Sequence, residues 1–302
     1  MARPSPSLIP AGMFSPVALP ARICWRRFRA AGLRRRRIAL PNASLSFWQG
    51  GAPHSPLMLI QGFGASAVWQ WHSQVGALAG DRSLIVPDLL GFGGSVLQRG
   101  AHSLDAQVDA LRGLLDRLSI QAADLAGISY GGFVALRLAQ RHPDRVRRLV
   151  IVDSPGVGYT PADYDRLLQR FSIRHVSELL MPRRPALIRR LLRIALHRPP
   201  WIPEPLLPSI HRSFFSDRLA EKRQMLDDAL AMLRQPGGPP DALPPHEAMV
   251  VWGEHDPLFP LALGERMAHR LGAALRVVPE TAHAPNVERP VWFNHHVNRF
   301  LR

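Results

Sequence analysis

A serine stands between two glycines in Gly127-Ile128-Ser129-Tyr130-Gly131, which has the pattern G-x-S-x-G. Glycines at this spacing let the backbone make a tight turn that exposes the serine hydroxyl. A serine hydroxyl becomes a strong nucleophile only when a neighbouring base removes its proton. The pattern therefore predicts nucleophilic catalysis by Ser129, in a turn shaped by Gly127 and Gly131.

The base must be one of the 13 histidines of the chain. His283 is the best candidate, because it follows the last expected strand and lies in a loop. His255 also lies in a loop, whereas His295 and His296 fall within the expected final helix. We therefore predict that His283 is the general base for Ser129.

A carboxylate is needed to orient the imidazole of such a base. Asp256 follows the expected strand that ends at Trp252, and the order serine, acid, histidine along the chain accompanies many G-x-S-x-G serines. Asp153 follows an earlier strand and is the main alternative, and Glu254 is a weaker one. Asp256 is therefore the predicted acid.

Two backbone N–H groups should stabilise the negative charge that forms on the substrate oxygen. One is expected from Tyr130, the residue after the nucleophile, and the other from Phe63 in the glycine-rich loop Gln61–Gly64. This chemistry needs no metal and no organic cofactor, and the sequence has no metal-ligand spacing. We expect neither.

These residues need a scaffold that brings the ends of several strands together. Short apolar strands alternate with helical segments, an order that predicts an α/β protein whose mostly parallel sheet has helices on both faces. In such sheets the active site lies at the carboxyl ends of the strands. The expected strands are Leu57–Ile60, Ser83–Val86, Ala123–Ile128, Val146–Val152, Ala248–Trp252 and Leu275–Val278, and the expected helices are Ala106–Leu118, Gly132–Arg141, Leu261–Leu271 and Val291–Leu301.

The alternation stops between residues 156 and 235, where helical segments are interrupted by prolines. Thr160-Pro161 and Pro185 are typical helix starts, and Asp217–Arg234 reads as a third helix that stops at Gly237-Gly238. An insertion of this kind predicts a helical cap over the active site. It follows Val146–Val152, the fourth strand named above, which we count as the sixth strand of the complete fold. The expected plan is a basic Pro/Arg-rich segment (1–40), the first part of the core (41–156), the cap (157–235) and the second part of the core (236–302).

The formal charge is +15 and comes almost wholly from arginine, since Lys222 is the only lysine. A single cysteine, Cys24, excludes an internal disulfide. No run approaches the roughly 20 apolar residues that span a bilayer. The stretch Leu8–Cys24 is broken by prolines and lacks a cleavage site, so we expect a cytoplasmic protein without a secretory signal.

Two arginine-rich segments have further interpretations. Residues 21–37 combine apolar side chains with many arginines, and such segments can lie on an anionic membrane surface. Peripheral membrane contact is therefore a hypothesis. Residues 185–197 carry Arg189, Arg190 and Arg193 on one side of a helix that we expect to pack on the core. No recognition module accompanies Arg34–Arg37, so no nucleic-acid partner is expected.

Five blocks of the sequence together resemble the α/β-hydrolase superfamily, from about residue 45 to the end of the chain. The resemblance implies an α/β-hydrolase fold with a serine, aspartate and histidine triad. Within the superfamily the chain is similar to the monoacylglycerol-lipase-like and plant α/β-hydrolase branch, through Trp69-Gln70-Trp71 and the stretch Ser213–Met225. One departure is Gln61, where the family usually has histidine. The blocks are Gln61–Gly64, Pro87–Ser95, Gly127–Gly132, Gly253–Pro257 and His283–Pro290.

The resemblance favours a carboxylesterase or monoacylglycerol-lipase-like enzyme that cleaves lipophilic esters through an acyl-enzyme on Ser129. The apolar cap favours an acyl chain in the pocket. Carbon–carbon bond hydrolases of the meta-cleavage type are an alternative, although their elbow commonly resembles Gly-Asn-Ser-Met-Gly-Gly and Ile128 and Tyr130 differ. Cofactor-free perhydrolases and a ligand-binding receptor on the same fold are further alternatives. Ser129 argues against dehalogenases and epoxide hydrolases, which place aspartate there.

Overall fold

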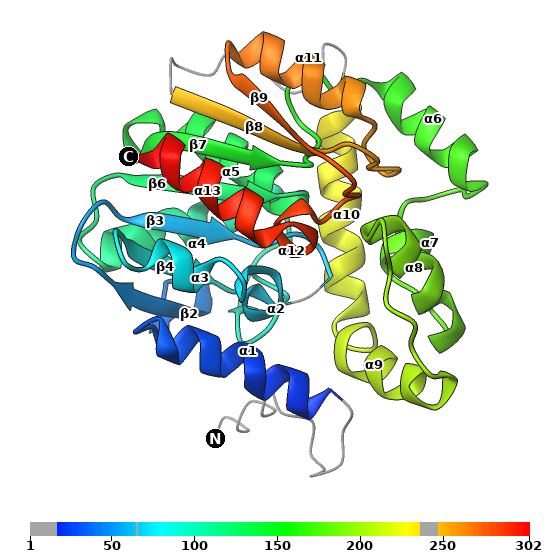
Figure 1. Cartoon of the computed structure of the whole chain (residues 1–302), viewed down its shortest axis with the longest axis horizontal. Coiled ribbons are helices and arrows are strands. Elements are labelled where there is room, and N and C mark those ends of the chain that lie inside the picture. The colour runs from blue at the N-terminus through cyan, green and yellow to red at the C-terminus, as the bar shows by residue number, and fades with distance from the viewer. Residues whose placement is uncertain (1–16, 65, 236–246) are drawn as a thin grey trace.

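The computed structural model describes residues 17–64, 66–235 and 247–302. A nine-stranded sheet runs through the molecule in the order β1-β2-β4-β3-β6-β7-β8-β9, with β5 paired to β2 (Figure 1). Pairs β1–β2, β2–β4 and β2–β5 are antiparallel and the others are parallel, as expected for a mostly parallel sheet. The strands are β1 (Arg34–Ala39), β2 (Ala43–Gly51), β3 (Leu57–Ile60), β4 (Ser83–Pro87), β5 (Val96–Leu97), β6 (Ala123–Ile128), β7 (Val146–Val152), β8 (Glu247–Gly253) and β9 (Ala274–Val278).

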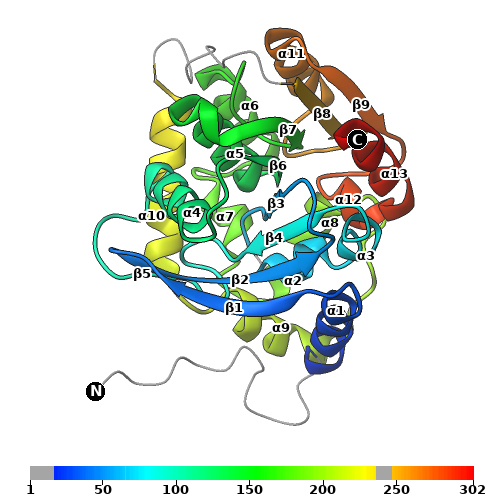
Figure 2. The ribbon, with the colours of Figure 1, turned by 90° about the vertical axis from the view of Figure 1, so that its left-hand side faces the viewer.

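Helices cover both faces of the sheet (Figure 2). One face packs against α1 (Ala18–Ala30), α2 (Ala67–Trp71), α3 (Val75–Leu78) and α13 (Pro290–Leu301). The other face packs against α4 (Leu104–Arg117), α5 (Tyr130–Arg141) and α11 (Leu261–Leu271). Every residue of β3 and of β6 is buried, because central parallel strands are covered on both sides. In the described part of the chain, none of the helices has the length and apolar character that crossing a membrane requires.

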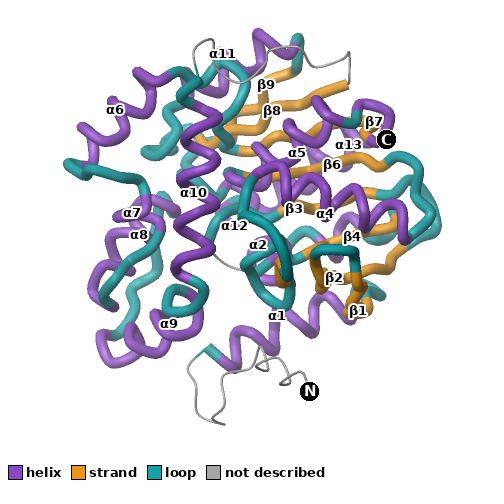
Figure 3. The backbone as a smooth tube through the Cα atoms, turned by 180° about the vertical axis from the view of Figure 1, so that it is seen from behind, coloured by secondary structure: helices purple, strands orange, loops and turns teal. Residues whose placement is uncertain are grey.

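The insertion between β7 and β8 is helical. Without the two-residue β5, β7 is the sixth strand along the chain. Figures 1 and 3 show these helices as a layer beside the ends of the strands. In Figure 1 the arrowheads of β3 and β7 point toward this layer. Thr160 caps the first of them in a capping box with Asp163, as the Thr160-Pro161 signal predicts. The predicted stop at Gly237-Gly238 lies outside the described residues. The cap helices are α6 (Pro161–Phe171), α7 (Ser177–Leu180), α8 (Ile188–Ala195), α9 (Leu207–Phe214) and α10 (Leu219–Leu233).

The N-terminal segment differs from the expectation that residues 1–40 stand apart from the core. Its described part forms α1 and β1, and Phe28 of α1 is fully buried with its ring 5.1 Å from that of Trp48. Strand β1 pairs with β2 along its whole length, from Arg34 to Ala39. Arginine at four successive positions conceals the two-residue alternation by which a strand is normally identified. The sheet therefore includes β1, and α1 packs into the core beneath it.

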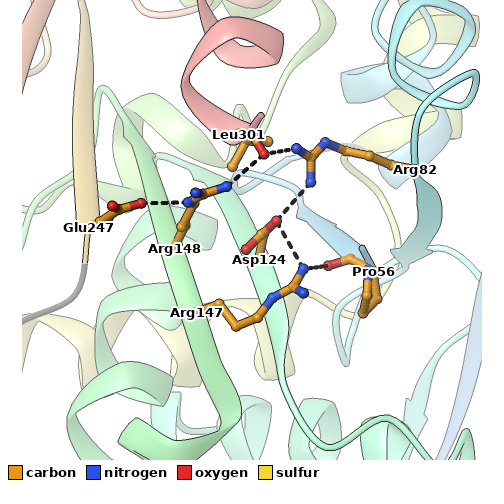
Figure 4. A network of polar contacts seen from close by, with 7 residues as sticks. All are labelled: Pro56, Arg82, Asp124, Arg147, Arg148, Glu247 and Leu301. Atoms are coloured by element: carbon orange, nitrogen blue, oxygen red, sulfur yellow. Dashed lines mark hydrogen bonds and ion pairs between the residues drawn. The ribbon is translucent and has the colours of Figure 1, made fainter. Parts of the chain in front are cut away.

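A network of arginines lies at the amino ends of β6 and β7 (Figure 4). The buried Asp124 carboxylate accepts hydrogen bonds from Arg82 Nη1 at 2.8 Å and from Arg147 Nη2 at 3.1 Å. Arg82 and Arg148 both donate to the carbonyl of Leu301, at the end of α13. The network fastens the last helix to the sheet at the edge opposite the carboxyl ends of the strands, so its role is structural.

Candidate active site

Ser129 lies in the sharp turn between β6 and α5. Its φ of 55° and ψ of −125° lie in a region that non-glycine residues rarely adopt. Its N–H donates to the carbonyl of Val152 at 2.8 Å, and its own carbonyl accepts from Gly132 N at 2.9 Å and Ser154 Oγ at 2.8 Å. These bonds to the neighbouring strand and helix hold the strained turn, which projects the serine at the carboxyl end of β6.

The two glycines of the motif make this turn sterically feasible. A Cβ at Gly127 would lie 2.7 Å from the carbonyl carbon of Gly131. A Cβ at Gly131 would lie 2.5 Å from the carbonyl oxygen of Ile60. Backbone atoms cannot move away from such contacts as a flexible side chain can. A side chain at either position would therefore displace the serine from the strand end.

The loop Gln61–Gly64 runs directly beside the serine. A Cβ at Gly62 would lie 3.2 Å from Ser129 Cβ, and the ring of Phe63 makes an edge contact with that of Tyr130 at 6.2 Å between centroids. Tyr130 begins α5, so its N–H belongs to the first turn, where helix N–H groups lack intrahelical acceptors. Both backbone segments from which the oxyanion donors are expected therefore flank Ser129.

His283 and Asp256 form a direct pair. Nδ1 of the imidazole lies 2.8 Å from Asp256 Oδ2, in a site where the carboxylate side chain is 0% exposed and the imidazole 14%. Asp256 Oδ1 accepts hydrogen bonds from the backbone N–H groups of Leu258 at 2.7 Å and Phe259 at 3.0 Å. With the carboxylate fixed and Nδ1 engaged, Nε2 is the ring nitrogen left to exchange a proton.

Asp153, the alternative acid, also lies at this edge but has a different environment. It is fully buried, and its Oδ1 accepts the N–H of Gly253 at 2.8 Å. Among the described residues, no donor reaches its Oδ2. Burial, and then the nearby carboxylates of Asp256 and Glu288, raise the pKa of Asp153 well above its ordinary value. A carboxyl whose ionised form is disfavoured in this way is less suited than Asp256 to stabilise an imidazolium.

This raised pKa predicts a stability effect. The folded protein holds a proton on Asp153 where the unfolded chain releases it, so the free energy of unfolding should fall as pH rises from about 3.9 toward the raised pKa. Asp153→Asn removes this titration. We expect the variant to lose that pH-dependent decline and to be more stable than the parent at neutral pH, by about 1.4 kcal/mol for each pH unit between the two pKa values.

Urea unfolding of both proteins from about pH 4 to about pH 8 measures this difference. Asp165→Asn, at an exposed position of α6, is the matched control and should keep the slope of the parent. Identical slopes for the parent and Asp153→Asn would show that Asp153 is ionised in the folded protein.

The other candidate acid and histidines make contacts that join parts of the structure or lie on its surface. Glu254 Oε2 accepts the N–H of Glu280 at 2.9 Å, so it joins two loops. The ring of His255 stacks on that of His197 at 4.8 Å. His295 is exposed on α13, and the ring of His296 stacks on Trp292 at 3.7 Å. Of the candidate histidines and acids, His283 and Asp256 are therefore the two that pair directly at this edge.

Two residues just after His283 were not predicted to have a role. They lie in α12 (Pro285–Glu288). Glu288 accepts the N–H of Ala282 at 2.8 Å and, from the cap, that of His197 at 2.7 Å. The fully buried Asn286 donates to the carbonyl of Gln70 in α2 at 2.8 Å. Both residues hold the loop that carries His283 in place. Their polar side chains lie inside the block His283–Pro290, and this is the sequence feature from which a role could have been predicted.

The model of the "alpha/beta hydrolase fold" family matches residues 55–290, which is most of the chain. The chain belongs to the α/β-hydrolase family. It is 35% identical to a 2-hydroxymuconate semialdehyde hydrolase of Pseudomonas sp. (strain CF600) over 270 residues, covering 82% of this chain and 86% of the relative. It is 33% identical to an enzyme of the same name from Pseudomonas putida over 239 residues, covering 73% and 77%.

Solved structures share the fold of this α/β-hydrolase over most of its length. A bacterial membrane phospholipase A superposes with a TM-score of 0.80 at 25% identity, covering 96% of this chain and 92% of that one. A meta-cleavage product hydrolase superposes with a TM-score of 0.70 at 24% identity, covering 88% and 97%, which shows the fold alone.

The finer placement in the monoacylglycerol-lipase-like branch is not supported. The curated relatives named above are hydrolases of 2-hydroxymuconate semialdehyde. The placement rested on short stretches such as Trp69-Gln70-Trp71, and these lie where the cap meets the core: the ring of Trp69 contacts that of Phe214 in α9 at 5.2 Å. An aromatic contact of this kind serves packing and does not identify a branch.

Proposed function

We propose that this α/β-hydrolase uses Ser129 as nucleophile, His283 as general base and Asp256 to orient the imidazole. The hydrogen bond of 2.8 Å between His283 Nδ1 and Asp256 Oδ2, at the sheet edge that carries the G-x-S-x-G turn, is the observation that supports it most. Ser129 Oγ attacks a carbonyl carbon while His283 Nε2 takes its proton. The N–H groups of Phe63 and Tyr130 stabilise the oxyanion.

We propose that the bond cleaved is a carbon–carbon bond beside a ketone or aldehyde, in substrates of the 2-hydroxy-6-oxo-dienoate class. The support is the 35% identity to a 2-hydroxymuconate semialdehyde hydrolase over most of both chains. In the keto tautomer, the electron pair of the broken bond is delocalised over the conjugated 2-oxo acid, which takes up the proton from His283. Water then hydrolyses the acyl group from Ser129.

Ester hydrolysis is the second candidate, because the same residues can expel an alcohol. Two observations favour it. Ile128, beside the nucleophile, is buried and apolar where the carbon–carbon hydrolase pattern has asparagine. The membrane phospholipase A superposes over 96% of this chain. In this reaction His283 protonates the leaving oxygen rather than carbon, and an acyl-enzyme on Ser129 is again the intermediate.

A substrate panel separates the two reactions. We expect kcat/KM for a 2-hydroxy-6-oxo-dienoate to exceed that for every member of a p-nitrophenyl ester series from short to long acyl chains. The reverse order would make the protein an esterase. Absence of turnover on both classes, together with no labelling by a fluorophosphonate, would reject the serine hydrolase proposal and favour a ligand-binding receptor.

A dienoate substrate carries a carboxylate that needs a cation. Arg189 and Arg190 of α8 donate to the backbone carbonyls of Ile202 and Phe171, so they are engaged within the cap. The buried Lys222 of α10 has its ammonium 5.6 Å from the ring of Phe92, which packs at 5.3 Å against Phe63 of the oxyanion loop. Lys222 Nζ is also paired, with Asp217 at 2.7 Å, but only this cation of the three lies beside the loop that carries Phe63. We therefore propose Lys222 as the carboxylate anchor.

Lys222→Met should raise KM for the dienoate about tenfold or more, the scale of one lost hydrogen bond to a charged group. KM for a neutral ester should stay unchanged. Methionine keeps the unbranched apolar stem of lysine without its ammonium group. The partner carboxylate of Asp217 is exposed, so it tolerates the loss. Arg193→Met, which removes an exposed charge of the cap, is the control. An equal rise of KM for both substrates would show that Lys222 only packs the cap.

A further inference from the structure

Helix α1 has an apolar stripe on its solvent side. Its inner face buries Ala21, Cys24 and Phe28 against the sheet. On the opposite face Leu19 is 67% exposed and Ile23 is 46% exposed. The two lie one turn apart, so they form one continuous stripe. Folding alone does not explain this stripe, because the fold already uses the other face.

Arginines flank this stripe. At 100° per residue, Arg22 and Arg29 lie on one side of it, Arg27 lies on the other, and Arg26 lies beside its centre; all four are exposed. Across the residues that the structure describes, none of these four forms an ion pair with a carboxylate. The sequence has no aspartate or glutamate before Asp81, so neither α1 nor the strands β1, β2 and β3 that follow it supply a carboxylate to these arginines.

We propose that the outer face of α1 docks on an anionic lipid surface. Leu19 and Ile23 enter the boundary between headgroups and acyl chains, and the flanking arginines contact the lipid phosphates. Each arginine near such a surface strengthens binding about fivefold, and inserted apolar area adds to this. The apolar stripe is complementary to the acyl-chain boundary of a membrane, and the arginines that border it are complementary to the anionic headgroups.

The position of α1 relates docking to the proposed active site. Helix α1 packs beside α2, whose Trp69 contacts Phe214 of the cap helix α9 at 5.2 Å. Figures 1 and 3 show α1 and α9 at the same end of the molecule. A protein docked through α1 therefore holds the seam between cap and core close to the lipid surface.

A nucleic acid is the other polyanion that such a surface could meet. Proteins that hold single strands offer exposed aromatic side chains on which bases stack. The one aromatic residue of α1 that is not fully buried, Trp25, lies away from the stripe and already packs against Trp48 at 5.6 Å and against the Arg35 guanidinium at 5.4 Å. The side chains at the centre of the exposed face are aliphatic, and this favours lipid.

Vesicle sedimentation with the full chain tests the proposal. We expect binding to phosphatidylcholine vesicles that contain phosphatidylglycerol, weakening as salt is raised, and little binding to pure phosphatidylcholine. Arg22→Gln with Arg26→Gln should weaken binding about 30-fold. Leu19→Ser with Ile23→Ser should also weaken it and should remove the part that persists at high salt.

Arg117→Gln with Arg276→Gln is the matched control, because it removes the same charge from α4 and from the opposite edge strand β9. The proposal requires this control to bind like the parent, with all variants unfolding at similar temperatures. If the control weakened vesicle binding as much as Arg22→Gln with Arg26→Gln does, the net charge of the protein and not the face of α1 would explain the binding. Equal binding to neutral vesicles, or tighter binding to duplex or single-stranded DNA than to vesicles, would overturn the proposal. Sedimentation needs no turnover, so a failed substrate assay leaves this result interpretable.

Discussion

Ser129→Ala should lower kcat by about 10⁴-fold or more on whichever substrate the protein hydrolyses. Without Oγ no acyl-enzyme forms, and only the oxyanion donors and substrate binding remain to accelerate attack by water. His283→Ala should cost a similar amount, because nucleophile and base act as a unit. Single-turnover and steady-state assays of the purified variants measure both losses.

The fold should survive the serine substitution. Alanine keeps the backbone hydrogen bonds to Val152 and Gly132, and it has a Cβ in the same strained conformation as serine. The melting temperature should therefore change little, while fluorophosphonate labelling should disappear. Turnover at the parental rate in Ser129→Ala would move the nucleophile elsewhere.

Asp256→Asn should reduce kcat to a comparable degree, about 10⁴-fold. The carboxylate accepts from His283 Nδ1 on one oxygen and from Leu258 and Phe259 N–H groups on the other. An amide must keep its oxygen toward the two N–H groups, so its NH₂ faces Nδ1. This favours the tautomer with the proton on Nε2, which cannot accept a proton from Ser129.

Asp153→Asn is the matched comparison for this variant, because Asp153 lies at the same edge and is fully buried. It should change kcat only slightly, because a protonated carboxyl and an amide are both neutral. A large loss in Asp153→Asn with a small loss in Asp256→Asn would assign the acid to the strand end of β7 instead. The two variants together therefore decide between the two carboxylates by a comparison within one assay.

The central strands were predictable because burial on both faces leaves short, uninterrupted apolar runs. The predicted bounds of Leu57–Ile60, Ala123–Ile128 and Val146–Val152 agree with β3, β6 and β7. Strands at the antiparallel end of the sheet were missed. β2 mixes apolar, polar and glycine residues, and β1 is mostly arginine, so neither carries the pattern by which buried strands are identified.

The predicted pairing of His283 with Asp256 follows from chain order, because parallel strands bring their carboxyl ends to one edge. The protonated state expected for Asp153 was not predictable, because it depends on burial and on a neighbouring carboxylate. The loop contacts of Asn286 also depend on which helix, α2, the histidine loop meets. The bond that is cleaved depends on side chains gathered from cap and core, which short motifs do not encode.

Strand β1 is the last strand of the described sheet, and its outer edge offers N–H and C=O groups to any strand of another molecule. Such open edges are where proteins join into aggregates. Here two copies that approached edge to edge would bring the runs Arg34–Arg37 of both molecules together, and their like charges would repel. We therefore expect the arginine run to oppose self-association through the open edge of β1.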